Sequence, residues 1–171
     1  YQSEKYFAHH KDYLKSLYTM PKSLNEEIQQ KYGDVLKKKN TVALHIRTFA
    51  PDKGEVMLQE QGTKGGIKGV SWSYYLSAIK MLPKDATILI FSDAPNWVKH
   101  HFPPICQRVV FIEGNTHYFD FWMMSLCDHF IVAPKSTFSW WSAWLKENKE
   151  TMILCEGNSS KNPDYYPDRW T

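Results

Sequence analysis

The sequence predicts an α/β fold: a Rossmann-like, doubly wound and mainly parallel sheet. Two features of the chain predict it. Short, continuously apolar β-rich runs alternate with amphipathic stretches, which is typical of buried parallel strands joined by helical crossovers. Proline and polar breakers separate these runs at short intervals. Ligands bind such sheets beyond the carboxyl ends of the strands, so a site is expected among the residues that follow each strand.

The expected elements can be placed from apolar periodicity and from helix start and stop signals. A helix over residues 23–39 has Ser23 as its expected N-cap, and it joins an N-terminal helical segment (residues 1–40) to the main domain (residues 41–171). Thr116 is the expected N-cap of a later helix. Strands are expected at residues 41–47, 87–92, 108–112, 129–133 and 151–155. The helices between them are expected at residues 73–82, 95–101, 117–127 and 138–148.

Composition excludes several classes of protein. With 171 residues, 43% hydrophobic and 23% charged, the chain can bury a core and is not a disordered segment. Apolar runs stay well below the ~20 residues of a transmembrane helix. Three scattered cysteines favour a reducing compartment over a disulfide scaffold or a cysteine zinc site. A net charge of +3, from dispersed basic residues, predicts no nucleic-acid partner.

Known cofactor and metal motifs are also missing from the sequence. It contains no Asp-x-Asp pair, which would be the usual carboxylate clamp for a metal-bound diphosphate. It contains no Gly-x-Gly-x-x-Gly fingerprint of nicotinamide or flavin dinucleotides. We therefore expect neither a metal nor a cofactor. The glycine-rich stretch at residues 62–69 lacks the spacing of a phosphate loop and is expected to be a mobile loop.

The first expected strand ends in two polar residues that share one face. His45 and Arg47 lie two positions apart, so their side chains point the same way from the strand. The planar guanidinium of Arg47 matches the geometry of a phosphate, and His45 can donate to a phosphate, a ribose or a base. The alternative is structural: Arg47 pairs with a carboxylate, and His45 is a satisfied buried residue.

The second and fourth strands also end in residues that suit a nucleotide. Asp93 can accept from sugar hydroxyls or orient the arginine, or it can simply cap the next helix. Ser136 and Thr137, with Lys135 beside them, begin a helix whose free backbone N–H groups can bind an anion. The alternative for these hydroxyls is an ordinary N-cap. The delivery of such residues to one rim by three separate strands favours a binding site.

Together these residues resemble the bacterial α-1,2-fucosyltransferases of glycosyltransferase family 11. The most specific segment is Ser-Thr-Phe-Ser-Trp-Trp-Ser-Ala-Trp-Leu at residues 136–145. The first-strand His-Ile-Arg resembles the start of the family's His-x-Arg-Arg-Gly-Asp motif, although Thr48, Phe49 and Ala50 replace its second Arg, Gly and Asp. Weaker similarity covers residues 1–7, 91–97, 120–129 and 163–170.

The resemblance implies an inverting, metal-independent enzyme of the GT-B fold. Its C-terminal, Rossmann-like half would bind GDP-fucose, which serves as donor substrate, and its N-terminal half would help to hold a glycan acceptor with a galactoside hydroxyl. The sequence resembles only the C-terminal part of the family, and it does not say whether the native protein carries the N-terminal half. The implied setting is the cytoplasm, peripheral to the inner membrane where surface glycans are assembled. The sequence does not specify an oligomeric state.

The resemblance also implies roles for individual residues. Arg47 would contact the donor diphosphate, and His45 and Asp120 would lie at the nucleotide end. The segment formed by Ser136, Thr137 and Phe138 would lie over the phosphates and nucleoside. Lys135 replaces the family's Asn before Ser-Thr, and it is from the strand ends alone that we expect Lys135 to add charge and Asp93 to contribute to the same site. The carboxylates nearest to the altered motif, Asp52 and Glu55, are the candidates for the general base.

Two other functions remain open from the residues alone. A non-catalytic module that binds a nucleotide sugar or a carbohydrate would have the same fold and the same rim of polar residues. A Rossmann-like transferase for another nucleotide sugar would differ only in its base and sugar contacts. Turnover of GDP-fucose separates the first alternative from an enzyme, and competition between GDP and UDP separates the second.

Overall fold

The computed structural model describes residues 3–48, 70–158 and 161–171. Its centre is a five-stranded sheet in the order β3-β2-β1-β4-β5, and every neighbouring pair of strands is parallel. The strands are β1 (Thr41–Ile46), β2 (Thr87–Ser92), β3 (Arg108–Phe111), β4 (His129–Ile131) and β5 (Ile153–Leu154). This topology confirms the predicted parallel, Rossmann-like α/β class, and its strand order reverses between β1 and β4.

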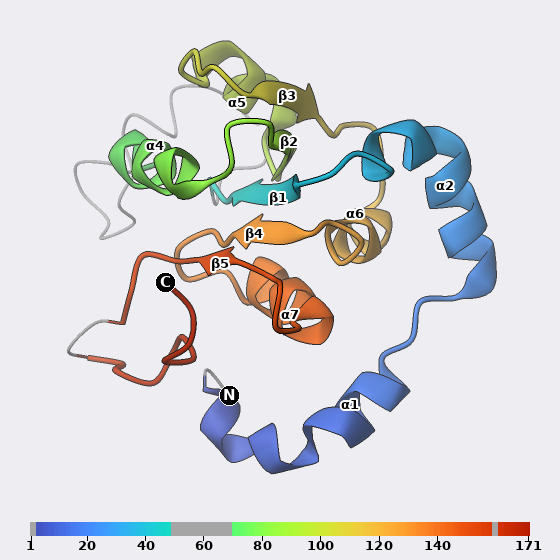
Figure 1. Ribbon diagram of the computed structural model, residues 1–171, viewed down its shortest axis with the longest axis vertical. Helices are drawn as coiled ribbons and strands as arrows, with labels where there is room; N and C mark the ends of the chain where they lie inside the picture. Colours follow the sequence, from blue (N-terminus) through green and yellow to red (C-terminus); the bar gives the residue numbers. More distant parts are fainter. Residues whose placement is uncertain (1–2, 49–69, 159–160) are drawn as a thin grey trace.

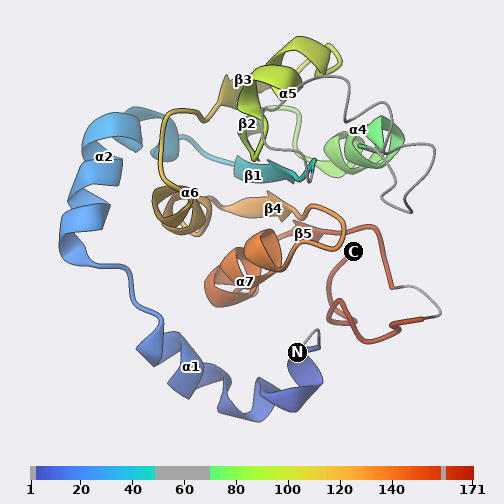
Figure 2. The same cartoon turned by 180° about the vertical axis from the view of Figure 1, so that it is seen from behind.

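Helices cover both faces of the sheet (Figures 1 and 2). In chain order they are the short 3₁₀ turns η1 (Glu4–Tyr6) and η2 (Ala8–His10), then α1 (Lys11–Leu17), α2 (Lys22–Leu36), α4 (Trp72–Met81), α5 (Pro95–His101), α6 (His117–Met124) and α7 (Thr137–Lys146). Helices α4 and α5 lie on one face, and α6 and α7 lie on the other (Figure 1). The segment from η1 to α1 curves around the outer side of α7 in both views.

Alternate residues along a strand pack into two separate hydrophobic cores, one on each face of the sheet. Val42 and Leu44 of β1 pack with α4 and α5, whereas Ala43 packs with α2, α6 and α7. Strands buried on both faces are apolar at almost every position, which is why β1 reads as a continuous apolar run. Leu24 and Ile28 of α2 belong to the same core as α6 and α7, so this N-terminal helix packs on the sheet domain.

The aromatic segment of α7 is mainly core. Trp140 and Trp144 are 5% and 0% exposed, and their indole rings stack 6.2 Å apart. Trp141 is only half-buried and stacks against Phe7 of the N-terminal segment with a centroid distance of 5.0 Å. Trp140 and Trp144 are therefore core residues, whereas Trp141 packs against the N-terminal segment.

Of the two N-caps predicted from the sequence, one is confirmed and one is wrong. Thr116 is the N-cap of α6, and its hydroxyl accepts a hydrogen bond from the backbone N–H of Phe119 at 3.2 Å. The prediction for Ser23 is wrong. Helix α2 begins at Lys22 with Pro21 at its N-cap, so Ser23 already lies within the first turn. Proline fixes the backbone at that position, and the helix starts directly after it.

Replacing Thr116 by Ala is expected to lower the free energy of unfolding by about 1 kcal/mol, because α6 loses the acceptor for an N-terminal N–H group. Urea denaturation followed by circular dichroism measures the change. Ser23→Ala is the matched control, since Ser23 is exposed and does not occupy a cap position. Equal losses in the two variants would contradict a capping role for Thr116.

Candidate functional site

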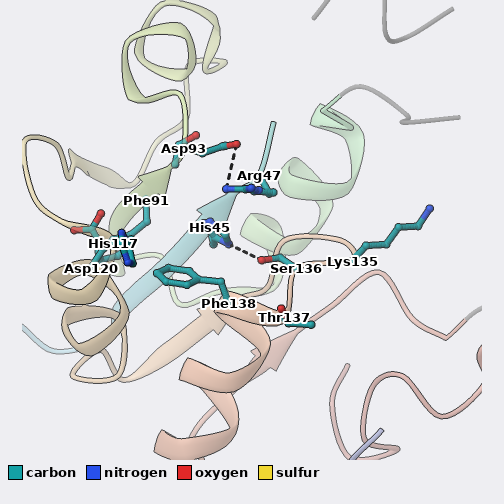
Figure 3. A pocket seen from close by; sticks show the side chains of 11 residues that line it. His45, Arg47, Phe91, Asp93, His117, Asp120, Lys135, Ser136, Thr137 and Phe138 are labelled. Carbon is teal, nitrogen blue, oxygen red and sulfur yellow. Dashed lines mark hydrogen bonds and ion pairs between the residues drawn. The ribbon is translucent and has the colours of Figure 1, made fainter. Parts of the chain in front are cut away.

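A cavity of about 400 Å³ opens at the carboxyl edge of the sheet, where the strand order reverses between β1 and β4. Helix α4 lies on one face of the sheet, and α7, which follows β4, lies on the other, an arrangement that is typical of a crevice between the ends of β1 and β4. The cavity is lined by His45, Arg47, Phe91, Ser92, Asp93, His117, Asp120, Lys135, Ser136, Thr137 and Phe138. Figure 3 shows how these side chains surround it.

An arginine and a carboxylate form one wall of the cavity. Nη1 of Arg47 lies 3.3 Å from Oδ2 of Asp93, and the two side chains come from the ends of β1 and β2 (Figure 3). The other oxygen, Oδ1 of Asp93, accepts hydrogen bonds from the backbone N–H of Thr48 at 2.8 Å and from its hydroxyl at 3.1 Å. Asp93 is thus held by the strand end itself, and it orients the guanidinium next to the cavity.

These contacts decide between the two interpretations of Asp93. The N-cap of α5 is Ala94, whose N–H is hydrogen-bonded to the hydroxyl of Ser92 at 3.0 Å. The capping alternative for Asp93 is therefore wrong. The alternative for Arg47, pairing with a carboxylate, is correct in geometry, but the pair lines the cavity. The side chain of Arg47 is 41% exposed and that of Asp93 is 9% exposed, so the arginine is the accessible member of the pair.

His45 lies at the floor of the cavity as a neutral side chain. Burial lowers its pKa to about 4, with Asp93 opposing and Arg47 assisting that shift. Its Nδ1 lies 3.4 Å from the hydroxyl of Ser136, and its ring lies 5.5 Å from that of Phe138. The imidazole therefore joins the strand end to the start of α7 without adding charge at neutral pH.

The start of α7 forms another wall of the cavity, and within the described part of the chain its backbone N–H groups are not capped by a side chain. Ser136 occupies the N-cap position, but its hydroxyl faces His45, and among the described residues no side chain caps α7. The simple N-cap alternative for Ser136 is therefore wrong. The N–H groups of the first turn lack intrahelical partners, so this ten-residue helix presents a partial positive charge at its start. Thr137 lies at the rim beside it.

Lys135 holds an unusual backbone conformation just before this helix. Its φ angle is +58°, in the left-handed region that residues other than glycine rarely adopt. Its side chain is exposed and extends away from the other labelled side chains in Figure 3. Strain of this kind gathers at functional sites, and here it turns the chain so that Ser136 faces the cavity.

Asp120, for which the resemblance implies a place at the nucleotide end, lines the same cavity as Arg47. Burial raises the pKa of Asp120 to about 6, against a hydrogen bond from Asn115 and the charges of Lys31 and His117, which lower it. His117 lies beside Asp120 and Phe91 in Figure 3. A carboxylate in this setting can accept hydrogen bonds from N–H groups of a ligand, and it titrates close to the physiological range.

The structure gathers eight of the predicted residues around this one cavity: His45, Arg47, Asp93, Asp120, Lys135, Ser136, Thr137 and Phe138. The remaining two, Asp52 and Glu55, lie outside the described residues, as does the glycine-rich stretch at residues 62–69. His117 was not predicted from the sequence, although it precedes Asp120 by three positions on one expected helix face. Nor was a role predicted for Thr48, whose hydrogen bonds to Asp93 leave no signal in a sequence pattern.

The residues around the cavity suit a ligand that carries a diphosphate at one end and an uncharged polar group at the other. They provide one accessible guanidinium, one helix N-terminus and several hydroxyls, while the half-buried carboxylate of Asp120 lies at the far end. Within the described ranges, no cluster of three or more His, Cys, Asp or Glu side chains has the arrangement of a metal site. Across the same ranges, every helix is too short or too polar to cross a lipid bilayer.

Comparison with known proteins places the chain in a family. The family described as glycosyl transferase family 11 matches residues 1–170. An alpha-1,2-colitosyltransferase from Escherichia coli is 35% identical over 182 aligned positions, which cover 99% of this chain and 59% of the relative. The chain thus spans little more than half the length of this curated relative. Because the family match extends almost from end to end, the chain belongs to glycosyl transferase family 11.

Proposed function

We propose that this chain is the donor-binding part of an inverting glycosyltransferase that transfers L-fucose from GDP-fucose to a galactoside hydroxyl of a glycan. The observation that supports it most is the shared cavity of Arg47, Ser136 and Asp120 at the reversal of strand order. Family membership supports the transfer chemistry, and the residues around the cavity support a nucleotide diphosphate as the donor's leaving group.

The cation and the helix start would act on the leaving group. As the sugar departs through an oxocarbenium-like state, negative charge grows on the β-phosphate. Arg47 and the first turn of α7 would stabilise that charge from fixed positions, and each such donor is worth about 3–4 kcal/mol by analogy with oxyanion holes. In this proposal the transfer needs no divalent metal, because protein groups neutralise the diphosphate.

The far end of the cavity would recognise the base. Guanine presents two adjacent N–H donors, N1–H and the exocyclic amine, and a carboxylate such as Asp120 can accept both. Uracil offers a single N–H between two carbonyl oxygens, and those oxygens would meet the carboxylate unfavourably. His45, neutral because its burial lowers its pKa, can donate or accept without repelling the nucleotide.

The general base of an inverting transfer must reach the acceptor hydroxyl. Asp52 and Glu55 are the first carboxylates after β1 in the sequence, and we propose that one of them takes the proton. Their replacement by amides should abolish transfer in the full-length protein while GDP affinity is retained.

The relative's name favours a second donor sugar, colitose. Colitose is L-fucose without its 3-hydroxyl, so the two donors differ in one hydrogen-bonding group. A site that binds the 3-hydroxyl rejects the deoxy sugar strongly, whereas an apolar contact there discriminates weakly. Competition between the two GDP sugars for this chain therefore identifies the donor.

Calorimetric titration of the chain with GDP, with and without EDTA, tests the nucleotide part of the proposal. We expect saturable binding at sub-millimolar GDP, no effect of EDTA and at least about 10-fold weaker binding of UDP, given the lost base contacts. Absence of binding at millimolar GDP would contradict the proposal. Transfer or hydrolysis of GDP-fucose by the full-length protein then separates an enzyme from a binding module of the same fold.

A further inference from the structure

A carboxamide supports Asp120 from behind the cavity. Nδ2 of Asn115 donates to Oδ1 of Asp120 at 3.0 Å, and Asn115 precedes α6 while Asp120 lies in its first turn. The same Nδ2 lies 3.3 Å from the hydroxyl of Tyr32 on α2. Asn115 does not line the cavity, so it acts on a ligand only through Asp120.

A lysine from α2 determines which end of this amide faces Asp120. Nζ of Lys31 donates to Oδ1 of Asn115 at 2.5 Å. An ammonium group can only donate, so it fixes the amide oxygen on its own side and turns the NH₂ group toward Asp120. The ammonium is itself held over the rings of Tyr32 and Phe119, at 5.3 and 5.7 Å from their centroids.

The turn before α6 places Asn115 for this contact. Gly114 has a φ angle of +74°, a conformation that residues other than glycine rarely adopt, and Thr116 caps the helix two positions later. Asn115 is thus confined between a left-handed turn and a helix cap. Its side chain lies between Lys31 on one side and Asp120 on the other.

We propose that Asn115, oriented by Lys31, is a positioning residue that holds the Asp120 carboxylate as the acceptor for the guanine base. This inference rests on the proposed function, because it takes GDP as the ligand. It extends the site to α2, an element of the N-terminal segment that contributes no residue to the cavity lining. Base recognition then depends on a contact between two helices as well as on the strand ends.

The chain of contacts also controls the charge of Asp120. Burial raises the pKa of this carboxyl to about 6, and the hydrogen bond from Asn115 and the charges of Lys31 and His117 work against that rise. The other charged or titratable groups around the cavity are His45, Arg47, Asp93 and Lys135. Only the ionised carboxylate accepts both guanine donors, so loss of the Asn115 contact should move the fall in GDP affinity to higher pH.

Asn115→Asp is the sharpest variant. It has almost the same shape and still offers Lys31 an acceptor, but it replaces the donor to Asp120 by a like charge. We expect GDP affinity to fall about 5–10-fold at pH 6.5 and less than about 3-fold at pH 8, where Asp120 ionises again. The terminal phosphate of GDP itself titrates near pH 6, so each result is read as the ratio of variant to wild type at the same pH.

Two further variants separate positioning from folding. Lys31→Met should shift the profile in the same direction but less, whereas Lys22→Met, an exposed lysine of the same helix, should leave it unchanged. A purely structural role for Asn115 would lower the melting temperature without moving the pH dependence. Identical GDP profiles of Asn115→Asp and wild type would overturn the inference.

A titration without nucleotide keeps this test separate from the proposed function. Carbon NMR of the Asp120 side-chain carboxyl follows its ionisation directly, and we expect the midpoint to lie higher in Asn115→Asp than in wild type. An unchanged midpoint overturns the support that Asn115 gives to Asp120, whatever the ligand. A raised midpoint in a chain that does not bind GDP supports that contact and instead overturns the proposed function.

Discussion

Arg47→Ala is expected to weaken GDP binding at least about 100-fold, since two losses add. The variant removes a charge-assisted contact to the diphosphate, which is worth about 1.5–3 kcal/mol. It also leaves the carboxylate of Asp93, now without its ion pair, facing the phosphates across the same cavity. Asp93 remains held in place by Thr48, so it cannot turn away from the ligand.

Calorimetry with matched arginine variants measures this effect. Arg47→Lys keeps the charge but loses the planar fork, and we expect an intermediate loss of about 10-fold. Arg108→Ala is the control, because Arg108 is exposed and starts β3 at the opposite edge of the sheet from the cavity. If wild type binds GDP and Arg47→Ala binds it equally well, Arg47 does not hold the diphosphate.

The order of elements could be predicted because buried parallel strands leave a strong pattern. Residues 87–92 and 95–101 were expected as a strand and a helix, and β2 and α5 have those bounds. The length of the edge strand β5 was overestimated. The strand expected at residues 151–155 pairs only as Ile153–Leu154, because its partner β4 is itself only three residues long. Strand length is set by the neighbouring strand, and a sequence pattern does not contain that information.

The site could be predicted as far as its residues follow directly from strand ends. His45, Arg47 and Asp93 were found because parallel strands share an edge. The hydrogen bonds of Thr48 to Asp93 could not be found, since they join two strand ends whose relative position depends on tertiary packing. The bond from Asn115 to Asp120 is local, but it depends on side-chain orientations that a sequence pattern does not contain. Backbone strain at Lys135 was also invisible, because nothing in that residue type suggests a left-handed conformation.

A second large effect is expected far from the cavity, at Glu147. Its carboxylate accepts hydrogen bonds from Lys11 at 2.7 Å, from Arg169 at 2.6 and 2.8 Å, and from the Trp170 indole at 2.9 Å. Arg169 also bonds Glu4, which accepts from the Trp144 indole. These contacts join the N-terminal segment, the end of α7 and the C-terminal tail.

Glu147→Gln should lower the free energy of unfolding by about 2 kcal/mol at pH 7. Burial alone would raise the pKa of Glu147, but the hydrogen bonds from Arg169, Lys11 and Trp170 outweigh it and lower the pKa from 4.5 to about 2. A fully buried pair with that shift would contribute about 3 kcal/mol, and the 44% exposure of Arg169 reduces it. The side chain of Glu147 is itself only 9% exposed, so its charge needs these partners.

The pH dependence of unfolding distinguishes this network from simple packing. Because the folded pKa of Glu147 is depressed, its contribution is complete above pH 4.5 and is lost as the pH falls toward 2. Urea denaturation at pH 7 and at successively lower pH should therefore show a steep acid loss in wild type and a shallower one in Glu147→Gln. Glu150→Gln, an exposed neighbour, should follow wild type. If the free energy of unfolding falls equally steeply with pH in wild type and in Glu147→Gln, ionised Glu147 does not join the chain ends.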